Sequence, residues 1–186
     1  MSPADAPSLV GVNVLLRRAR PQDQVDRLAV GYNREYVRLV GGELPPVDPP
    51  YTAADAAAWY ASVAREPHSW VIEFSGRCVG GARLHSLRTV ERRARYAIGL
   101  FDASVWNRGI GLEATRLVLA YAFETLHLHR VDLRVLALNT RAIAMYQRAG
   151  FVIEGTERDG AWINGRWESD VWMSILEEEY DGHDRT

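Results

Sequence analysis

The sequence predicts a mixed α+β domain in which helices flank a mostly antiparallel sheet. Two observations support this fold class. Short apolar runs separated by turns fill residues 69–101, which predicts antiparallel strands in a meander, and residues 94–150 follow the order strand, glycine-bearing loop, helix, strand, helix. With 186 residues and 47% hydrophobic content, the chain is long enough for one domain with a core and too short for two ordinary ones.

The first half of the chain combines strands with three helices. Residues 1–8 are rich in proline and alanine, so we expect a flexible tail there. Prolines over residues 43–51 predict a stiff extended loop, and Thr52 with Asp55 indicates a helix start. The elements predicted in order are a strand over 10–18, a helix over 23–32, a short helix over 33–40, a helix from 52 to before 67, a hairpin over 70–74 and 78–84, and a strand over 92–101.

A glycine-bearing loop follows the strand that ends near residue 101. Two glycines separated by one residue let backbone N–H groups approach an anion closely, and the helix behind them adds free first-turn donors and the positive end of its dipole. The spacing matches neither a P-loop nor a complete dinucleotide fingerprint. Taken alone, the loop fits either a pyrophosphate cradle or a turn that only starts a helix; its sequence is Trp106-Asn107-Arg108-Gly109-Ile110-Gly111.

The second half of the chain continues with alternating helices and strands. Asn139 suits a helix N-cap and Gly150 a helix stop, while Asn164-Gly165 is a strong hairpin signal. We expect residues 9–176 to form a single domain and residues 177–186 a polar C-terminal tail. The predicted elements are a helix over 109–128, a strand over 130–136, a helix over 140–148, and strands over 151–163 and 166–176.

The loop, the Asn139-to-Tyr146 segment and Gly150-Phe151 together resemble the acetyl-CoA-binding core of the GNAT N-acetyltransferase superfamily. The likeness is strongest to the branch of ribosomal-protein N-terminal and polyamine acetyltransferases. The resemblance implies a twisted sheet of about seven strands with a V-shaped splay, which receives the pantetheine arm beside the strand that ends at Leu100 and Phe101. It also implies that Asn139 bonds this arm and that the loop binds the pyrophosphate. One position departs from the pattern, because Trp106 stands where the family usually has glutamine or arginine.

Acetyl transfer to an amine requires a proton for the departing thiolate and a neutral amine. Tyr146 lies seven residues after Asn139, nearly two helical turns along, and the resemblance gives a tyrosine at this place the role of acid toward the sulfur. His85 and Glu35 are candidate general bases, and a water chain is the alternative to both.

The chain is therefore interpreted as an acetyl-CoA-dependent N-acetyltransferase acting on a primary amine, either a protein N-terminus or a small molecule. The alternative is a non-catalytic CoA-binding or sensing module, which the unusual Trp106 favours and Tyr146 with Asn139 disfavours.

Composition narrows the range of partners. A formal charge of −2 gives no electrostatic reason to expect nucleic acid, and no apolar stretch reaches the length of a membrane span. Cys78 is the single cysteine and is expected to be a buried thiol, and we expect a cytoplasmic protein without a metal. The tryptophans of the last hairpin are compatible with a homodimer.

Overall fold

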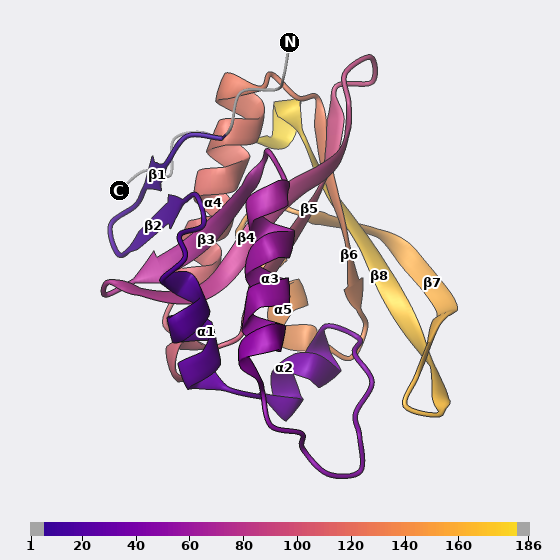
Figure 1. Cartoon of the computed structure of the whole chain (residues 1–186). Helices are drawn as coiled ribbons and strands as arrows, with labels where there is room; N and C mark the ends of the chain where they lie inside the picture. The colour runs from indigo at the N-terminus through magenta and orange to yellow at the C-terminus, as the bar shows by residue number, and fades with distance from the viewer. Residues whose placement is uncertain (1–5, 182–186) are drawn as a thin grey trace.

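The computed structural model describes residues 6–181 and shows an eight-stranded sheet with helices on both faces (Figure 1). The strand order is β1-β2-β3-β4-β5-β6-β8-β7, and every neighbouring pair is antiparallel except β5 and β6. The strands are β1 (Leu9–Val10), β2 (Val14–Arg17), β3 (Ser69–Phe74), β4 (Arg77–Arg88), β5 (Arg93–Leu100), β6 (Arg130–Leu136), β7 (Val152–Ile163) and β8 (Arg166–Leu176).

The helices form two layers. In Figure 1, α3 crosses in front of the sheet with α1 and α2 beside it, and α4 and α5 lie behind. None of the helices in the described part of the chain is both long and apolar enough to cross a membrane. The helices are α1 (Asp23–Val30), α2 (Arg34–Leu39), α3 (Ala53–Arg65), α4 (Ile110–Ala120) and α5 (Thr140–Arg148).

The predicted mixed α+β fold is confirmed, with eight strands instead of about seven. The difference lies in the strand expected over residues 10–18, which is two strands joined by a turn. Glu113 at the start of α4 bonds to the turn, since its carboxylate accepts the backbone N–H groups of Asn13 and Val14 and the Asn13 amide. A local backbone bond from the Gly11 N–H to the Val14 carbonyl, 2.9 Å, closes the turn, and the Glu113 side chain supports it from 100 residues away.

The end of the parallel pair β5–β6 is where the sheet opens. Only Arg93, Ala94 and Arg95 of β5 pair with β6, at Arg130, Val131 and Asp132. The remaining residues of β5, up to Leu100, continue to pair with β4 on their other side. The edge of β5 that faces β6 is therefore free of strand pairing from Tyr96 onward, as the expected splay requires.

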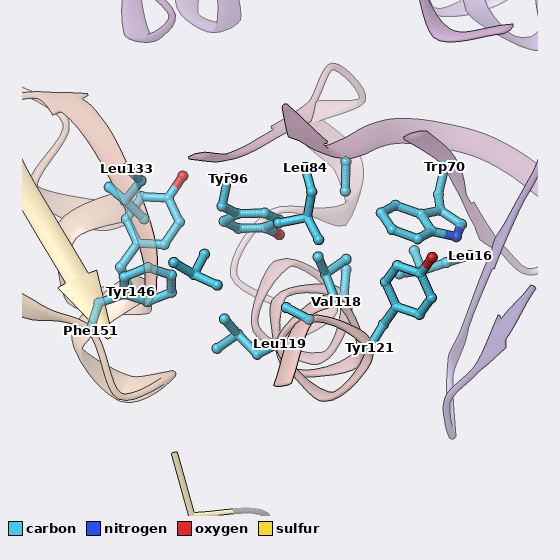
Figure 2. Close-up of a cluster of buried hydrophobic side chains, with 14 of the residues drawn as sticks. Leu16, Trp70, Leu84, Tyr96, Val118, Leu119, Tyr121, Leu133, Tyr146 and Phe151 are labelled. Carbon is cyan, nitrogen blue, oxygen red and sulfur yellow. The ribbon is translucent and has the colours of Figure 1, made fainter. Parts of the chain in front are cut away.

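The main core lies between the sheet and the layer of α4 and α5. Figure 2 shows Tyr96, Tyr146 and Phe151 side by side at one end of it and Trp70 with Tyr121 at the other. A second, smaller core of Val71, Cys78 and Phe101 packs against the helices on the opposite face. Both faces of the central strands are thereby covered, which fixes the position of β5.

The described parts of both terminal segments contact the rest of the domain. Ala6 belongs to the expected tail of residues 1–8, yet it is buried and its N–H donates to the Pro67 carbonyl. At the other end the Tyr180 ring stacks on Phe123 at 4.9 Å. The rest of the two expected tails, residues 1–5 and 182–186, lies outside the described residues.

Candidate active site

A cavity of about 860 Å³ occupies the opening between β5 and β6. This volume lies within the roughly 300–1,000 Å³ typical of ligand sites. The cavity is lined from three directions, namely by β5, by the start of α4 with α5, and by α2 with α3. Of the predicted site residues, those that line it are Leu100, Trp106, Asn107, Gly109, Ile110, Gly111, Asn139 and Tyr146.

The start of α4 offers backbone donors to this cavity. Gly109 is the N-cap with φ 80°, a left-handed conformation that favours glycine, and no side chain caps the helix. The first-turn N–H groups of an α-helix have no partner within the helix, so those of Ile110, Gly111 and Leu112 are available to a ligand. A Cβ added at Gly109 would meet no atom within 4 Å, so the backbone is open to approach. This geometry fits a pyrophosphate group.

Trp106 fastens the loop to the sheet. Its indole Nε1 donates to the Leu100 carbonyl at 2.8 Å, and the Arg141 guanidinium lies 4.0 Å from the centre of its ring. The indole is thereby held at the cavity lining, with Arg141, another lining residue, stacked on it. Two other predicted contact residues lie outside the lining: Arg108 sits over the Phe74 ring at 5.0 Å, and the Phe101 ring packs against Trp59 at 5.4 Å.

Tyr146 lines the cavity from α5, with only 6% of the residue exposed. Within residues 6–181 its hydroxyl has no hydrogen-bond partner, whereas the Tyr96 hydroxyl bonds Thr115 Oγ1 at 3.0 Å. Thr115 donates in turn to the Gly111 carbonyl at 2.7 Å, which ties β5 to the first turn of α4. Burial raises the pKa of the Tyr146 phenol above its usual value, so it keeps its proton at neutral pH.

Asn139 lines the cavity, and its side chain also makes two hydrogen bonds within the fold. Its Oδ1 accepts the Ala142 N–H at 3.1 Å and so caps α5, and its Nδ2 donates to the Leu39 carbonyl at 3.3 Å. Asn139 thereby joins the helix that carries Tyr146 to α2 on the opposite face. The predicted bond to the pantetheine arm stays a prediction.

Neither candidate base lines the cavity. The Glu35 carboxylate accepts both Arg38 bonds at 2.8 Å, and this interaction lowers its pKa. Glu35 borders a separate hollow of about 560 Å³. His85 lies farther along β4, with Nδ1 3.1 Å from Ser86 Oγ, and burial together with the nearby Arg83 and Arg95 lowers its pKa. The cavity thus brings Tyr146 and the cradle together and leaves the two candidate bases outside.

Tyr36 and Trp59 line the cavity and come from the segment between the first strand and residue 69, where the GNAT resemblance places the acceptor; other lining residues are not revealed by any motif. Tyr36 of α2 lies over β5, because a Cβ added at Gly99 would stand 2.5 Å from its hydroxyl. Arg83 of β4 and the pair Arg134 and Asp170, with Nη2 and Oδ2 2.8 Å apart, also line the cavity. Alternation along each strand could place these side chains on one face, but only the sheet order brings the strands together.

Comparison with known proteins agrees with this geometry. Residues 13–152 match the family described as the acetyltransferase (GNAT) domain. The chain belongs to the GNAT acetyltransferase family. YdaF of Bacillus subtilis (strain 168), named provisionally as a ribosomal N-acetyltransferase, is 36% identical over 110 residues, or 59% of each chain. The spermidine N(1)-acetyltransferase of Escherichia coli (strain K12) is 29% identical over 117 residues, covering 63% of this chain and 62% of that one.

The matched segments therefore span about three fifths of the length of these GNAT relatives. Solved structures cover more of the chain and support the fold. A GCN5-related N-acetyltransferase from Brucella melitensis has a TM-score of 0.80 at 20% identity, covering 96% of this chain and 82% of that one. The spermidine N-acetyltransferase from Vibrio cholerae, solved with CoA and spermine, has a TM-score of 0.72 at 23% identity, covering 90% of this chain and 98% of that one.

The predicted buried thiol is confirmed. Cys78 is fully buried, and burial raises its pKa to about 12, so it stays a thiol. The tryptophans of the β7–β8 hairpin do not line the cavity. Trp162 and Trp167 pack edge to face with ring centres 5.0 Å apart and remain 60% and 59% exposed.

Proposed function

We propose that this chain transfers an acetyl group from acetyl-CoA to a primary amine. The observation that carries the proposal is a single cavity that joins three features: the backbone donors of α4, the edge of β5 that pairs with no strand, and the hydroxyl of the largely buried Tyr146. Family membership agrees with this activity, and acetyl-CoA or CoA is the ligand that the cradle fits.

Different groups in the cavity bind different parts of acetyl-CoA, the acetyl donor. The first-turn N–H groups of α4 hold the pyrophosphate, with Arg141 as a nearby cation. The edge of β5 between Tyr96 and Leu100, apart from the Leu100 carbonyl that accepts the Trp106 indole, pairs with the pantetheine amides as an added strand would, and a backbone N–H there stabilises the negative charge on the acyl oxygen.

Tyr146 supplies the proton that completes the transfer. As the amine nitrogen bonds to the acyl carbon and the carbon–sulfur bond breaks, the phenol donates its proton to the sulfur. The amine loses its own proton to water, because Glu35 is bound by Arg38 and His85 lies outside the cavity lining. Tyr146 then recovers a proton from the same water.

The acceptor is a primary amine that enters between α2 and α3. Ribosomal and polyamine acetyltransferases among the relatives make a protein N-terminus and a polyamine the two classes to compare. A homodimer through the exposed tryptophan hairpin and a cytoplasmic location remain predictions.

Thiol release measured with acetyl-CoA and a panel of amines tests the proposal. We expect turnover with at least one amine and acetylation of its nitrogen by mass spectrometry. Tight CoA binding without turnover of any acceptor would instead support the non-catalytic sensing module, and absence of CoA binding would contradict the cradle itself.

A further inference from the structure

Arg83 is a cationic side chain on the acceptor side of the cavity that forms no ion pair within residues 6–181. It is exposed and lines the cavity. Building on the transferase function proposed above, we propose that the acceptor is a primary amine that also carries a carboxylate, and that Arg83 binds this carboxylate.

The position of Arg83 follows from the alternation of β4. Ala82 and Leu84 are buried in the core beneath α4. A Cβ at Gly81 would instead point toward α3, 3.9 Å from Val63 and 4.0 Å from Trp59. Because side chains two apart share a face, Arg83 points to the α3 side, where the acceptor enters.

Arg83 is also distant from the cradle. It lies opposite Ala97 in the β4–β5 register, three residues before Leu100, which corresponds to roughly 10 Å along the strand. The first turn of α4 lies beyond that end of β5 and on the other face of the sheet. Arg83 is therefore placed to meet the acceptor and not the pyrophosphate.

The carboxylates around the cavity argue against a polycation. Asp170 is the one carboxylate in the cavity lining within residues 6–181 and is 3% exposed. Its Oδ2 lies 2.8 Å from Arg134 Nη2, so it is paired with a cation, although Arg134 also lies 3.4 Å from Glu157 and this oxygen makes no hydrogen bond within the described residues. Those on the acceptor helices are also engaged, Glu35 by Arg38 and Asp55 by Thr52. A polyamine would meet the Arg83 cation, and the one carboxylate in the described cavity lining is already paired with Arg134, whereas an anionic group would form charge-assisted hydrogen bonds with Arg83.

Matched acceptor pairs test this inference and identify the source of the carboxylate. Short peptide amides that begin Ala-Glu or Ala-Gln differ only in a side-chain carboxylate. Alanine and alaninamide differ in the α-carboxylate and, through it, in the pKa of the amine, so their kcat/KM values are compared per neutral amine. We expect the carboxylate-bearing member of one pair to have a kcat/KM higher by roughly 10- to 100-fold, the range for hydrogen bonds to charged groups. We expect spermidine to be poorer than that acceptor. The pair that responds shows which carboxylate is bound.

The variant Arg83→Gln should remove this preference by raising the KM of the carboxylate-bearing acceptor, with an unchanged KM for acetyl-CoA. Arg83→Lys should restore part of it. Arg158→Gln is the matched control, since Arg158 is an exposed arginine of β7 outside the cavity lining. Thermal melting of the variants confirms that they fold.

Three results would overturn the inference: equal use of both members of each pair, preference for spermidine, or a raised acetyl-CoA KM in Arg83→Gln. These results leave the proposed transferase intact, because turnover is still observed. Absence of turnover with every amine would remove the proposed function and this inference together.

Discussion

The two walls of the cavity, the proposed donor wall and the proposed acceptor wall, offer different kinds of groups to a ligand. The donor wall presents backbone N–H groups from a helix start, with Gly109 in a left-handed conformation and Tyr146 behind it. The acceptor wall presents side chains, among them Tyr36 and Arg83, from elements far apart in the chain. A backbone site depends on local conformation, whereas a side-chain site depends on which elements meet. Substitutions on the two walls should therefore change different kinetic constants.

The largest effect is expected at Tyr146 on the donor wall. Tyr146→Phe keeps the ring and removes the proton donor, so kcat should fall by about 100-fold or more, the lower end for general acid catalysis. The KM for acetyl-CoA should change much less. Because burial raises the pKa of this phenol, kcat of the unmodified enzyme should not decline between pH 7 and about 10 through loss of its proton. An unchanged kcat in the variant would reduce Tyr146 to a packing role.

The next largest effect is expected for Gly109→Ala, and Gly76→Ala is its matched control. Gly109 and Gly76 have φ of 80° and 75°, and an added Cβ would meet no atom within 4 Å at either. Alanine should destabilise the fold by a similar amount at both, roughly 1–2 kcal/mol. Only Gly109→Ala should weaken CoA binding, by roughly 30-fold, because its Cβ stands where the pyrophosphate meets the backbone. Calorimetric titration with CoA measures this, and equal affinities for the two variants would contradict the cradle.

A second matched pair of variants, Gly99→Ala and Gly81→Ala, tests the acceptor wall. A Cβ at Gly99 would stand 2.5 Å from the Tyr36 hydroxyl, whereas one at Gly81, its partner across the strands, meets nothing closer than 3.4 Å. Gly99→Ala should displace Tyr36 and lower kcat/KM for the amine by about 10-fold, a cost of about 1.4 kcal/mol. Gly81→Ala should have a smaller effect on the same constant. If the two variants behave alike in steady-state kinetics, Tyr36 does not shape the acceptor site.

The smallest effect is expected at the start of α3. The Thr52 hydroxyl accepts the Asp55 N–H while the Asp55 carboxylate accepts the Thr52 N–H, which forms a capping box. Thr52→Ala should lower the free energy of unfolding by about 1 kcal/mol. Since neither residue lines the cavity, kcat and both KM values should stay unchanged. Urea denaturation measures the loss, and a changed amine KM would show that α3 positions the acceptor more directly.

Much of the fold could be predicted because its signals are local. The capping residues Thr52 and Asn139 and the hairpin turn at Asn164-Gly165 stand where the sequence indicates them. The break between β1 and β2 was not predicted: its local signal is only Gly11 and Asn13, and the bonds from Glu113 that support the turn come from far away in the chain. The same difference between local and long-range signals holds for the site. The motif predicted the loop at the start of α4 and Tyr146, but it did not predict that Arg83 and Asp170 line the cavity.

The sequence by itself determined the donor half of this protein. Glycine spacing, a helix start and a tyrosine two turns into α5 act through neighbouring backbone, so a linear motif describes them. Only the tertiary structure decided the acceptor half. The register of β4 on β5 and the early end of the β5–β6 pairing bring Arg83, Tyr36 and Asp170 to one cavity. Such long-range pairings depend on the packing of the whole sheet, which short stretches of sequence do not specify.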